Sequence, residues 1–290
     1  MSEIKRLAAL TMGLLAALVM STLTATVVSA QSSQDRIPST CFAVAQNLHS
    51  PELPVHFASF SMPASETKYD VTISYQGHST YLIESPAGVK IATDFAGWLA
   101  DPVTPDVVTM NQAHTSHYTN YPDPKIQHVL KGWGDDGKIA EHHLMVGDVL
   151  IRNVTTDILR WTAIPDGNSM FIFEVAGLCV GHLGHLHHKL TEDHYAKVGR
   201  LDVVMVAVDG GLTMSHLSAK EILKRLRSSV VLPMHVRSYD ALPNFLNYLG
   251  GEFAIERRKE NKLRVSLLNL PKTPTVILLP GVDTYYPPDE

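Results

Sequence analysis

Histidine is frequent in this chain and is clustered in one part of it. There are 15 histidines, and nine of them fall between His114 and His188. The imidazole side chain is the commonest metal ligand in proteins, and it can also act as a general acid or base near neutral pH. Random scatter seldom concentrates one residue type in this way, so the clustering indicates metal chemistry. Metal binding would require that the fold bring several of these side chains together.

Four polar segments of the sequence each follow directly on an apolar, strand-like run. They are Asp94, residues 112–117, residues 181–185 and His235. Loops at the ends of strands in an α/β sheet are held by a rigid scaffold, and ligands bind there. A single histidine at a strand end is more often a satisfied polar residue than a ligand. Four such ends in one chain favour a common site.

The elements that must position these segments change in character along the chain. Short alternating strands come first and predict an antiparallel meander, whereas strands and helices alternate after residue 178. The predicted strands cover residues 70–75, 80–84, 88–93, 106–110, 149–154, 170–175, 178–180, 201–208, 230–234, 263–268 and 275–279, and helices are predicted over 191–198, 217–226 and 240–249. This order indicates two sheets with helices outside them.

Composition limits the partners that the protein can have. The chain has 290 residues, 45% of them hydrophobic, which is enough for a sizeable core. The formal net charge is −5 and no basic block is present, so nucleic-acid binding is not expected. A small-molecule substrate is the expected partner, and the sequence does not indicate an oligomeric state.

The first 30 residues have the three parts of a secretory signal. Lys5 and Arg6 form a positive region, Leu7 to Met20 an apolar region, and Val28 to Ala30 a cleavage site. A periplasmic or secreted protein with no stable membrane insertion is therefore predicted, with residues 31–68 as an extended leader and 69–290 as the domain. The alternative is a membrane anchor, because residues 7–30 carry no charge.

The two cysteines, Cys41 and Cys179, leave two alternatives open. They could form a disulfide in an oxidising compartment, but the sequence does not show whether their Cα atoms lie close enough. Cys179 stands in the apolar run from Leu178 to Val180, which favours a buried free thiol.

From about Asp70 onward the sequence resembles the metallo-β-lactamase fold family, in particular its branch similar to ascorbate-6-phosphate lactonase and related metal-dependent hydrolases. The segments that carry the resemblance are GHSTYLIESPAGVKIATDF, PDVVTMNQAHTSHYTN, AGLCVGHLGHLHHKLT, LDVVMVAVDGG and VVLPMH. The resemblance implies a four-layer αββα sandwich, in which two mixed β-sheets carry helices on their outer faces.

The same resemblance implies a divergent metal site. Gln112 and Ser116 stand where the family motif has its first histidine and its aspartate, and His182 is interpreted as replacing the aspartate that bridges two metals. An imidazole normally gives one nitrogen to one metal, so we expect one ion per chain, zinc or another divalent metal. The ligands expected for this ion are His117, His182 and His235, with His114 nearby as a fourth ligand or as a group that orients water.

Further roles are implied around this site. Asp94 is expected to fix the tautomer of a ligand histidine, Asp209 to do the same or to cap a turn, and His185 to act as a proton donor or substrate contact. His187 and His188 are expected to be solvated. The predicted function is a hydrolase that uses metal-bound hydroxide on an ester, lactone, amide or phosphoester. The alternative is a catalytically inactive protein of this fold that binds a ligand or a metal.

Overall fold

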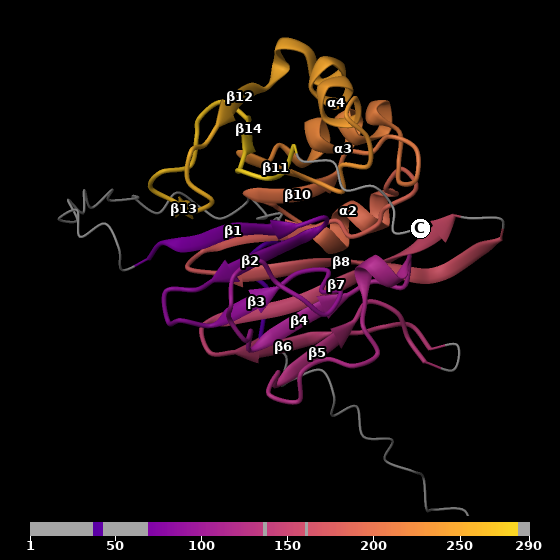
Figure 1. The fold of residues 1–290 in the computed structure, drawn as a ribbon, viewed down its shortest axis with the longest axis vertical. Coiled ribbons are helices and arrows are strands. Elements are labelled where there is room, and N and C mark those ends of the chain that lie inside the picture. The colour runs from indigo at the N-terminus through magenta and orange to yellow at the C-terminus, as the bar shows by residue number, and fades with distance from the viewer. Residues whose placement is uncertain (1–36, 43–68, 136–137, 160–161, 284–290) are drawn as a thin grey trace, which may run out of the picture. The chain divides into compact units, whose positions relative to one another are not determined.

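The computed structural model describes residues 37–42, 69–135, 138–159 and 162–283. The predicted signal segment and most of the predicted leader lie outside these residues. The described chain forms two mixed β-sheets with helices, as predicted (Figure 1). Among the described residues, no helix combines the length and the apolar character that a membrane crossing needs.

The first sheet is built mainly from the N-terminal half of the described chain. Its strand order is β13-β1-β2-β3-β4-β5, in which β1 to β3 form the predicted antiparallel meander and β3, β4 and β5 run parallel. The strands are β1 (Val71–Gly77), β2 (Thr80–Glu84), β3 (Lys90–Ala92), β4 (Val107–Met110), β5 (His128–Lys131) and β13 (Leu263–Val265).

The second sheet has the order β12-β14-β11-β10-β9-β8-β7-β6. Its strands are β6 (His143–Val146), β7 (Val149–Leu159), β8 (Ala163–Val175), β9 (Leu178–His182), β10 (Val203–Ala207), β11 (Val230–Met234), β12 (Ala254–Arg257) and β14 (Thr275–Leu278). Strands β9, β10 and β11 run parallel and are neighbours. Their carboxyl ends therefore meet at one edge of the sheet, where loops can converge on a ligand.

Three α-helices connect the parallel strands of the second sheet and lie beside it in Figure 1. They are α2 (Glu192–Val198), α3 (His216–Leu226) and α4 (Ala241–Leu249). Thr191 caps α2 by accepting a hydrogen bond from the backbone of His194, and Ser215 caps α3 in the same way. Two short 3-10 helices, η1 (Thr115–His117) and η2 (Gly250–Glu252), complete the set that the structure describes.

The hydrophobic core lies between the two sheets. Ile73, Ile83 and Ile91 of the first sheet belong to the same cluster as Phe171 and Val204 of the second, and all five side chains are fully buried. Each such side chain stabilises the fold by about 1.5–3 kcal/mol relative to exposure. The sandwich is therefore a rigid support for the loops at its edges.

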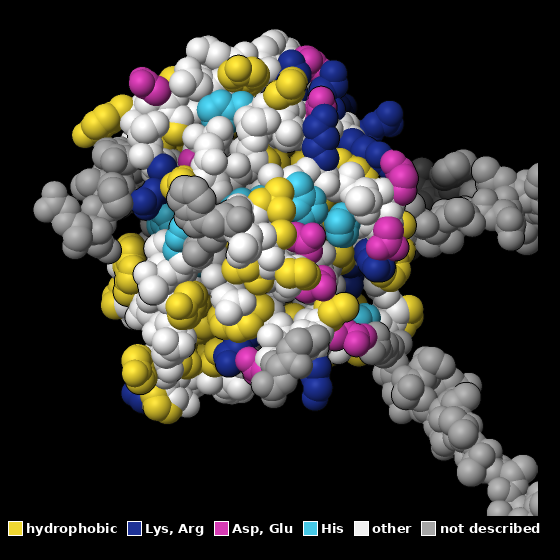
Figure 2. Space-filling model, turned by 90° about the vertical axis from the view of Figure 1, so that its right-hand side faces the viewer, with side chains coloured by type: hydrophobic (Ala, Val, Ile, Leu, Met, Phe, Trp, Pro, Cys, Tyr) yellow, Lys and Arg dark blue, Asp and Glu magenta, His cyan; other side chains and the backbone are white. Residues whose placement is uncertain are grey.

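Figure 2 shows one face of the molecule, on which hydrophobic side chains are widespread and charged side chains lie among them. Lysine, arginine and acidic side chains are distributed over it. Histidine side chains stand out at several points across the middle of this face (Figure 2).

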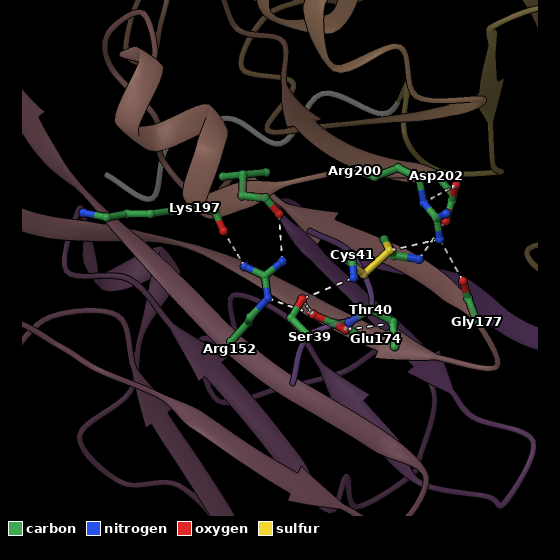
Figure 3. The surroundings of a disulfide bond; sticks show 11 residues. Ser39, Thr40, Cys41, Arg152, Glu174, Gly177, Lys197, Arg200 and Asp202 are labelled. Atoms are coloured by element: carbon green, nitrogen blue, oxygen red, sulfur yellow. Dashed lines mark hydrogen bonds and ion pairs between the residues drawn. A yellow bond between two sulfur atoms is a disulfide. The ribbon is translucent and has the colours of Figure 1, made fainter. Parts of the chain in front are cut away.

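A disulfide ties an N-terminal segment to the second sheet and corrects the expectation of a free thiol. Cys41 and Cys179 are bonded, with their Cα atoms 5.8 Å apart (Figure 3). The backbone N–H of Arg200 also donates to the carbonyl of Cys41 at 2.7 Å. Residues 38–42, called the strap below, consequently belong to the same compact unit as the sheets.

A buried ion pair lies beside the disulfide (Figure 3). Arg152 donates from Nε to Glu174 at 2.8 Å, and its other two nitrogens donate to the carbonyls of Lys197 and Val198, each at 2.7 Å. Glu174 also accepts the backbone N–H of Thr40 at 2.7 Å. Every charged group in this region has partners, so the strap is fixed by hydrogen bonds as well as by the covalent bond.

Candidate metal centre

Three histidines from three different loops converge at one point. His78 lies in the turn between β1 and β2, His117 ends η1 after β4, and His235 follows β11 directly. One nitrogen from each ring lies within 4.8 Å of a nitrogen of the other two. These residues are called the histidine triad below.

The backbone fixes two members of the triad to one another. His78 and His235 both have left-handed backbone conformations, with φ of 49° and 56°. The backbone N–H of His235 donates to the carbonyl of His78 at 2.8 Å. Histidine adopts this conformation more readily than most residues, but it is uncommon and marks a local constraint. The two loops therefore hold their side chains at a defined separation.

Two buried carboxylates orient the other ring nitrogens. Nδ1 of His117 hydrogen-bonds Oδ2 of Asp94, and Nδ1 of His235 lies 2.9 Å from Oδ1 of Asp209. Asp94 also accepts a hydrogen bond from the side chain of Asn111 at 2.8 Å. A carboxylate behind Nδ1 fixes the tautomer in which Nδ1 carries the proton, so that the lone pair of Nε2 is available to a metal. The sequence analysis expected this role for Asp94 and left Asp209 between this role and capping a turn; Asp209 also accepts the backbone N–H groups of residues 211–213.

The electrostatics favour neutral imidazoles and ionised carboxylates. Burial, together with the neighbouring His235 and His117, lowers the pKa of His78 to about 2. Burial also lowers the pKa of His235, although Asp209 acts in the opposite direction. Burial alone would raise the pKa of Asp94, but His117 and the hydrogen bonds outweigh it and lower the pKa. For His78 and His235, these directions favour the neutral state that a ligand imidazole must have.

The donor set fits a divalent metal ion. Nε2 of His78 and Nε2 of His117 are buried and have no hydrogen-bond partner among the described residues. Buried polar atoms are seldom left without a partner, and a site that binds an ion is one accepted reason for it. Three neutral imidazoles are an established ligand set for zinc. The sequence did not single out His78, although the polar turn Gly77-His78-Ser79 between two buried strands was a usable signal.

His185 lies against the triad but does not belong to it. Its ring centroid is 4.8 Å from those of both His117 and His235, and its Nε2 is buried without a partner among the described residues. Burial and the neighbouring histidines lower the pKa of His185. Its Nδ1 lies 2.8 Å from Nε2 of His187. His187 is half-buried and hydrogen-bonded, and His188 is also half-buried and accepts the backbone N–H of Asp157 at 3.2 Å, which corrects the expectation that both are solvated.

The structure brings together only part of the ligand set predicted from the sequence. Nε2 of His182 faces the carbonyl of Ser79 at 2.8 Å, and its Nδ1 accepts the N–H of Gly184 at 3.1 Å. Both nitrogens of this fully buried ring are therefore engaged, and it lies outside the triad. The ring of His114 is 5.8 Å from that of His117, so it stands beside the triad rather than within it.

A sandwich of two mixed sheets, with histidines on the loops at its edge, is the architecture of the metallo-β-lactamase class of proteins. Residues 72–235 match the family model described as the beta-lactamase superfamily domain. The chain belongs to this superfamily.

Comparisons with individual proteins agree with this assignment. The chain is 25% identical over 214 residues to a UPF0173 metal-dependent hydrolase of Anaeromyxobacter dehalogenans, covering 59% of this chain and 76% of the relative. A UPF0173 metal-dependent hydrolase of Myxococcus xanthus is 22% identical over 235 residues, covering 69% and 82%. Among solved structures, a candidate Zn-dependent hydrolase of the metallo-β-lactamase superfamily from Thermotoga maritima is 28% identical, with a TM-score of 0.53 and coverage of 72% and 97%.

Proposed function

We propose that this protein is an exported metal-dependent hydrolase that holds one zinc or similar divalent ion through the histidine triad. The observation that carries the proposal is the convergence of three imidazole nitrogens within 4.8 Å, two of them buried without partners among the described residues. The names of the relatives support the reaction class. When bound, such an ion supplies a Lewis acid and activates water near neutral pH, which suits an ester, lactone, amide or phosphoester.

The residues of the chain prepare the site for such an ion. Asp94 and Asp209 hold the Nδ1 protons of His117 and His235, so both Nε2 lone pairs are directed inward. Their two negative charges also offset the charge of one divalent ion. The ring of His185 lies against the triad, and its unpartnered Nε2 can contact a substrate or hold a proton.

One ion per chain is the expected occupancy. Among the described residues, the triad is the single group of three potential ligands whose donor atoms approach in this way. Both carboxylates near the triad are turned towards Nδ1 atoms, and we therefore assign neither of them to bridging a second ion.

Metal content and hydrolysis test the proposal together. Protein purified without added metal, and then loaded with zinc, should hold about one equivalent by elemental analysis. It should hydrolyse at least one member of a panel containing p-nitrophenyl acetate, bis(p-nitrophenyl) phosphate and simple lactones. Two equivalents would overturn the single-ion proposal, and none after loading would overturn the metal site. Metal retention without hydrolysis across the panel would support the binding-protein alternative.

Two alanine variants and a control distinguish the triad from the set predicted by sequence. His117→Ala should lose both the metal and the activity, by about 100-fold or more, because it removes a primary ligand. His182→Ala should keep the metal if the triad is correct, since both of its nitrogens bond to the backbone. The control is His128→Ala, on β5, which should change neither. Metal loss in His182→Ala with unchanged thermal stability would favour the sequence-based set.

Export has support from two independent features. Residues 1–30 have the pattern of a secretory signal, and the disulfide between Cys41 and Cys179 is of a kind that persists in oxidising compartments. Sequencing of the mature protein from a cell-envelope fraction should give an N-terminus at or near Gln31. An intact Met1 on membrane-bound protein would show instead that the segment is an anchor.

A further inference from the structure

His117, His185 and His235 are buried side by side at the site, and the group that contacts Nδ1 differs among them. For His117 and His235 the partner is a carboxylate, whereas for His185 it is another imidazole, that of His187. A carboxylate can only accept, so it forces the proton onto Nδ1 of the ring that it holds. An imidazole can accept or donate. The third ring is therefore free to adopt a tautomer that the other two cannot.

We propose that His187 is a positioning residue, which donates from Nε2 to Nδ1 of His185 and so directs an Nε2–H of His185 into the site. This inference rests on the proposed function. His185 then serves as a hydrogen-bond donor to the substrate, and not as a fourth metal ligand.

The backbone around His185 is held firmly, so the rotation of its ring is what a partner must still fix. Its backbone N–H donates to Oδ1 of Asn168 at 2.8 Å. Gly184, with φ of 60°, has no room for a Cβ atom, which would lie 2.3 Å from the same oxygen. The loop is therefore packed tightly on its support. The contact with His187 determines how the ring is turned within it.

The ring orientation places Nε2 where a donor is useful. The ring of His185 stands nearly perpendicular to those of His117 and His235, at interplanar angles of 83° and 90°. The Nε2 atoms of those two rings already offer lone pairs. A lone pair on Nε2 of His185 would repel them in the metal-free protein, and with an ion bound it would close the coordination position that catalytic sites leave open. An Nε2–H avoids both consequences and can bind a developing negative charge on the substrate.

The tautomer can be measured directly, without any assay of activity. Long-range ¹H–¹⁵N spectra of the imidazole rings in the zinc-loaded protein report which nitrogen of His185 carries the proton. We expect Nε2–H for His185 and Nδ1–H for His117 and His235. Nδ1–H on His185 in the wild type would overturn the proposal. If the protein binds no zinc, the same spectrum of metal-free protein still tests it, so this failure is distinguishable from failure of the proposed function.

A matched pair of variants tests the role of the partner. His187→Gln retains a side-chain N–H that can donate to His185, whereas His187→Glu at neutral pH can only accept and should move the proton to Nδ1. We expect His187→Glu and His187→Ala to lower kcat by about tenfold or more, as losses of such outer partners do, and His187→Gln to restore most of it. His188→Ala, at the neighbouring position, is the control.

Zinc affinity separates positioning from ligation. Since His185 is proposed as a donor, His187→Ala should leave the zinc dissociation constant within about threefold of wild type. A loss of zinc affinity that matches the loss of kcat would assign His185 to the metal and overturn the proposal. Equal kcat and an unchanged His185 tautomer in His187→Ala would also overturn it.

Discussion

Buried polar groups are fully hydrogen-bonded near one end of strand β9 and lack partners near the other. At Cys179, the strap region satisfies its charges, with Arg152 donating to one carboxylate and two carbonyls. Beyond His182, the histidine cluster leaves ring nitrogens of His78, His117 and His185 buried without partners among the described residues. Both regions are buried, so exposure does not explain the difference.

The difference indicates that the polar groups beside the disulfide stabilise the fold, whereas the histidine cluster serves binding. A buried polar group that is fully hydrogen-bonded can contribute to stability, whereas one left without a partner costs about 1–3 kcal/mol. A protein bears that cost where the unpartnered group has another use. We therefore expect substitutions at the strap to change mainly stability and substitutions at the triad to change mainly binding.

The largest effect on stability should come from Arg152. Arg152→Met removes one partner of the buried pair and leaves Glu174 and two carbonyls short of a donor, which should lower the free energy of unfolding by about 3 kcal/mol. Urea unfolding of the metal-free protein measures it. Arg257→Met, which breaks an exposed pair with Asp283, should cost less than about 1 kcal/mol. Equal losses of stability in the two variants would show that the buried pair of Arg152 and Glu174 contributes no more than an exposed pair.

Acid should destabilise the metal-free protein through the histidine cluster. The pKa of His78 is lowered to about 2, chiefly by burial, and the pKa values of His182 and His235 are lowered for the same first reason. Below pH 6.5 the unfolded chain takes up protons that the folded state does not. The free energy of unfolding should therefore fall by about 1.4 kcal/mol between pH 7.5 and 5.5 on account of His78 alone, and His182 and His235 should add to this fall.

Unfolding in the presence of a chelator at both pH values checks this sign. The triad variant His78→Asn should show a smaller fall than the wild type, because one buried imidazole is gone. A wild-type protein that is equally stable at pH 7.5 and 5.5 would mean that these histidines take up protons while folded.

The smallest effect on stability should come from His78 itself at pH 7.5. Its Nε2 has no hydrogen bond to lose, and asparagine tolerates the left-handed backbone at φ of 49°. His78→Asn should change the free energy of unfolding of metal-free protein by less than about 0.5 kcal/mol, yet weaken zinc binding by about tenfold or more. Titration with zinc against a competing chelator measures the second quantity. A large loss of stability with normal zinc binding would make His78 a structural residue.

Much of the fold followed from the sequence because its strands are fully buried. Runs such as 203–207 and 230–234 are apolar along their whole length, and the helices before and after the run 203–207 are capped by Thr191 and Ser215. The strands that were not predicted, β5, β6 and β12, are short, and β12 is exposed along its length. Pairing with a neighbouring strand defines them, and their own sequence shows no alternation.

The site was predicted at the level of loops and less well at the level of atoms. The segments around His117 and His235 and the carboxylates Asp94 and Asp209 could be found from polar residues that follow buried strands. The sequence could not show which of His182 and His185 faces the triad, because that depends on how the chain turns after β9. His78 was not identified because a turn between two strands needs no function to explain it.

The disulfide has a consequence for the order in which the chain can be completed. Cys41 and Cys179 are separated by 138 residues, and synthesis proceeds from the N-terminus. Cys41 therefore remains a thiol while strands β1 to β8 are being made, and its partner exists only once β9 has been added. The bond can close only in a chain that has brought β9 to the strap. Oxidation of this pair would thus follow the synthesis of strands β1 to β8 and would mark chains in which β9 has met the strap.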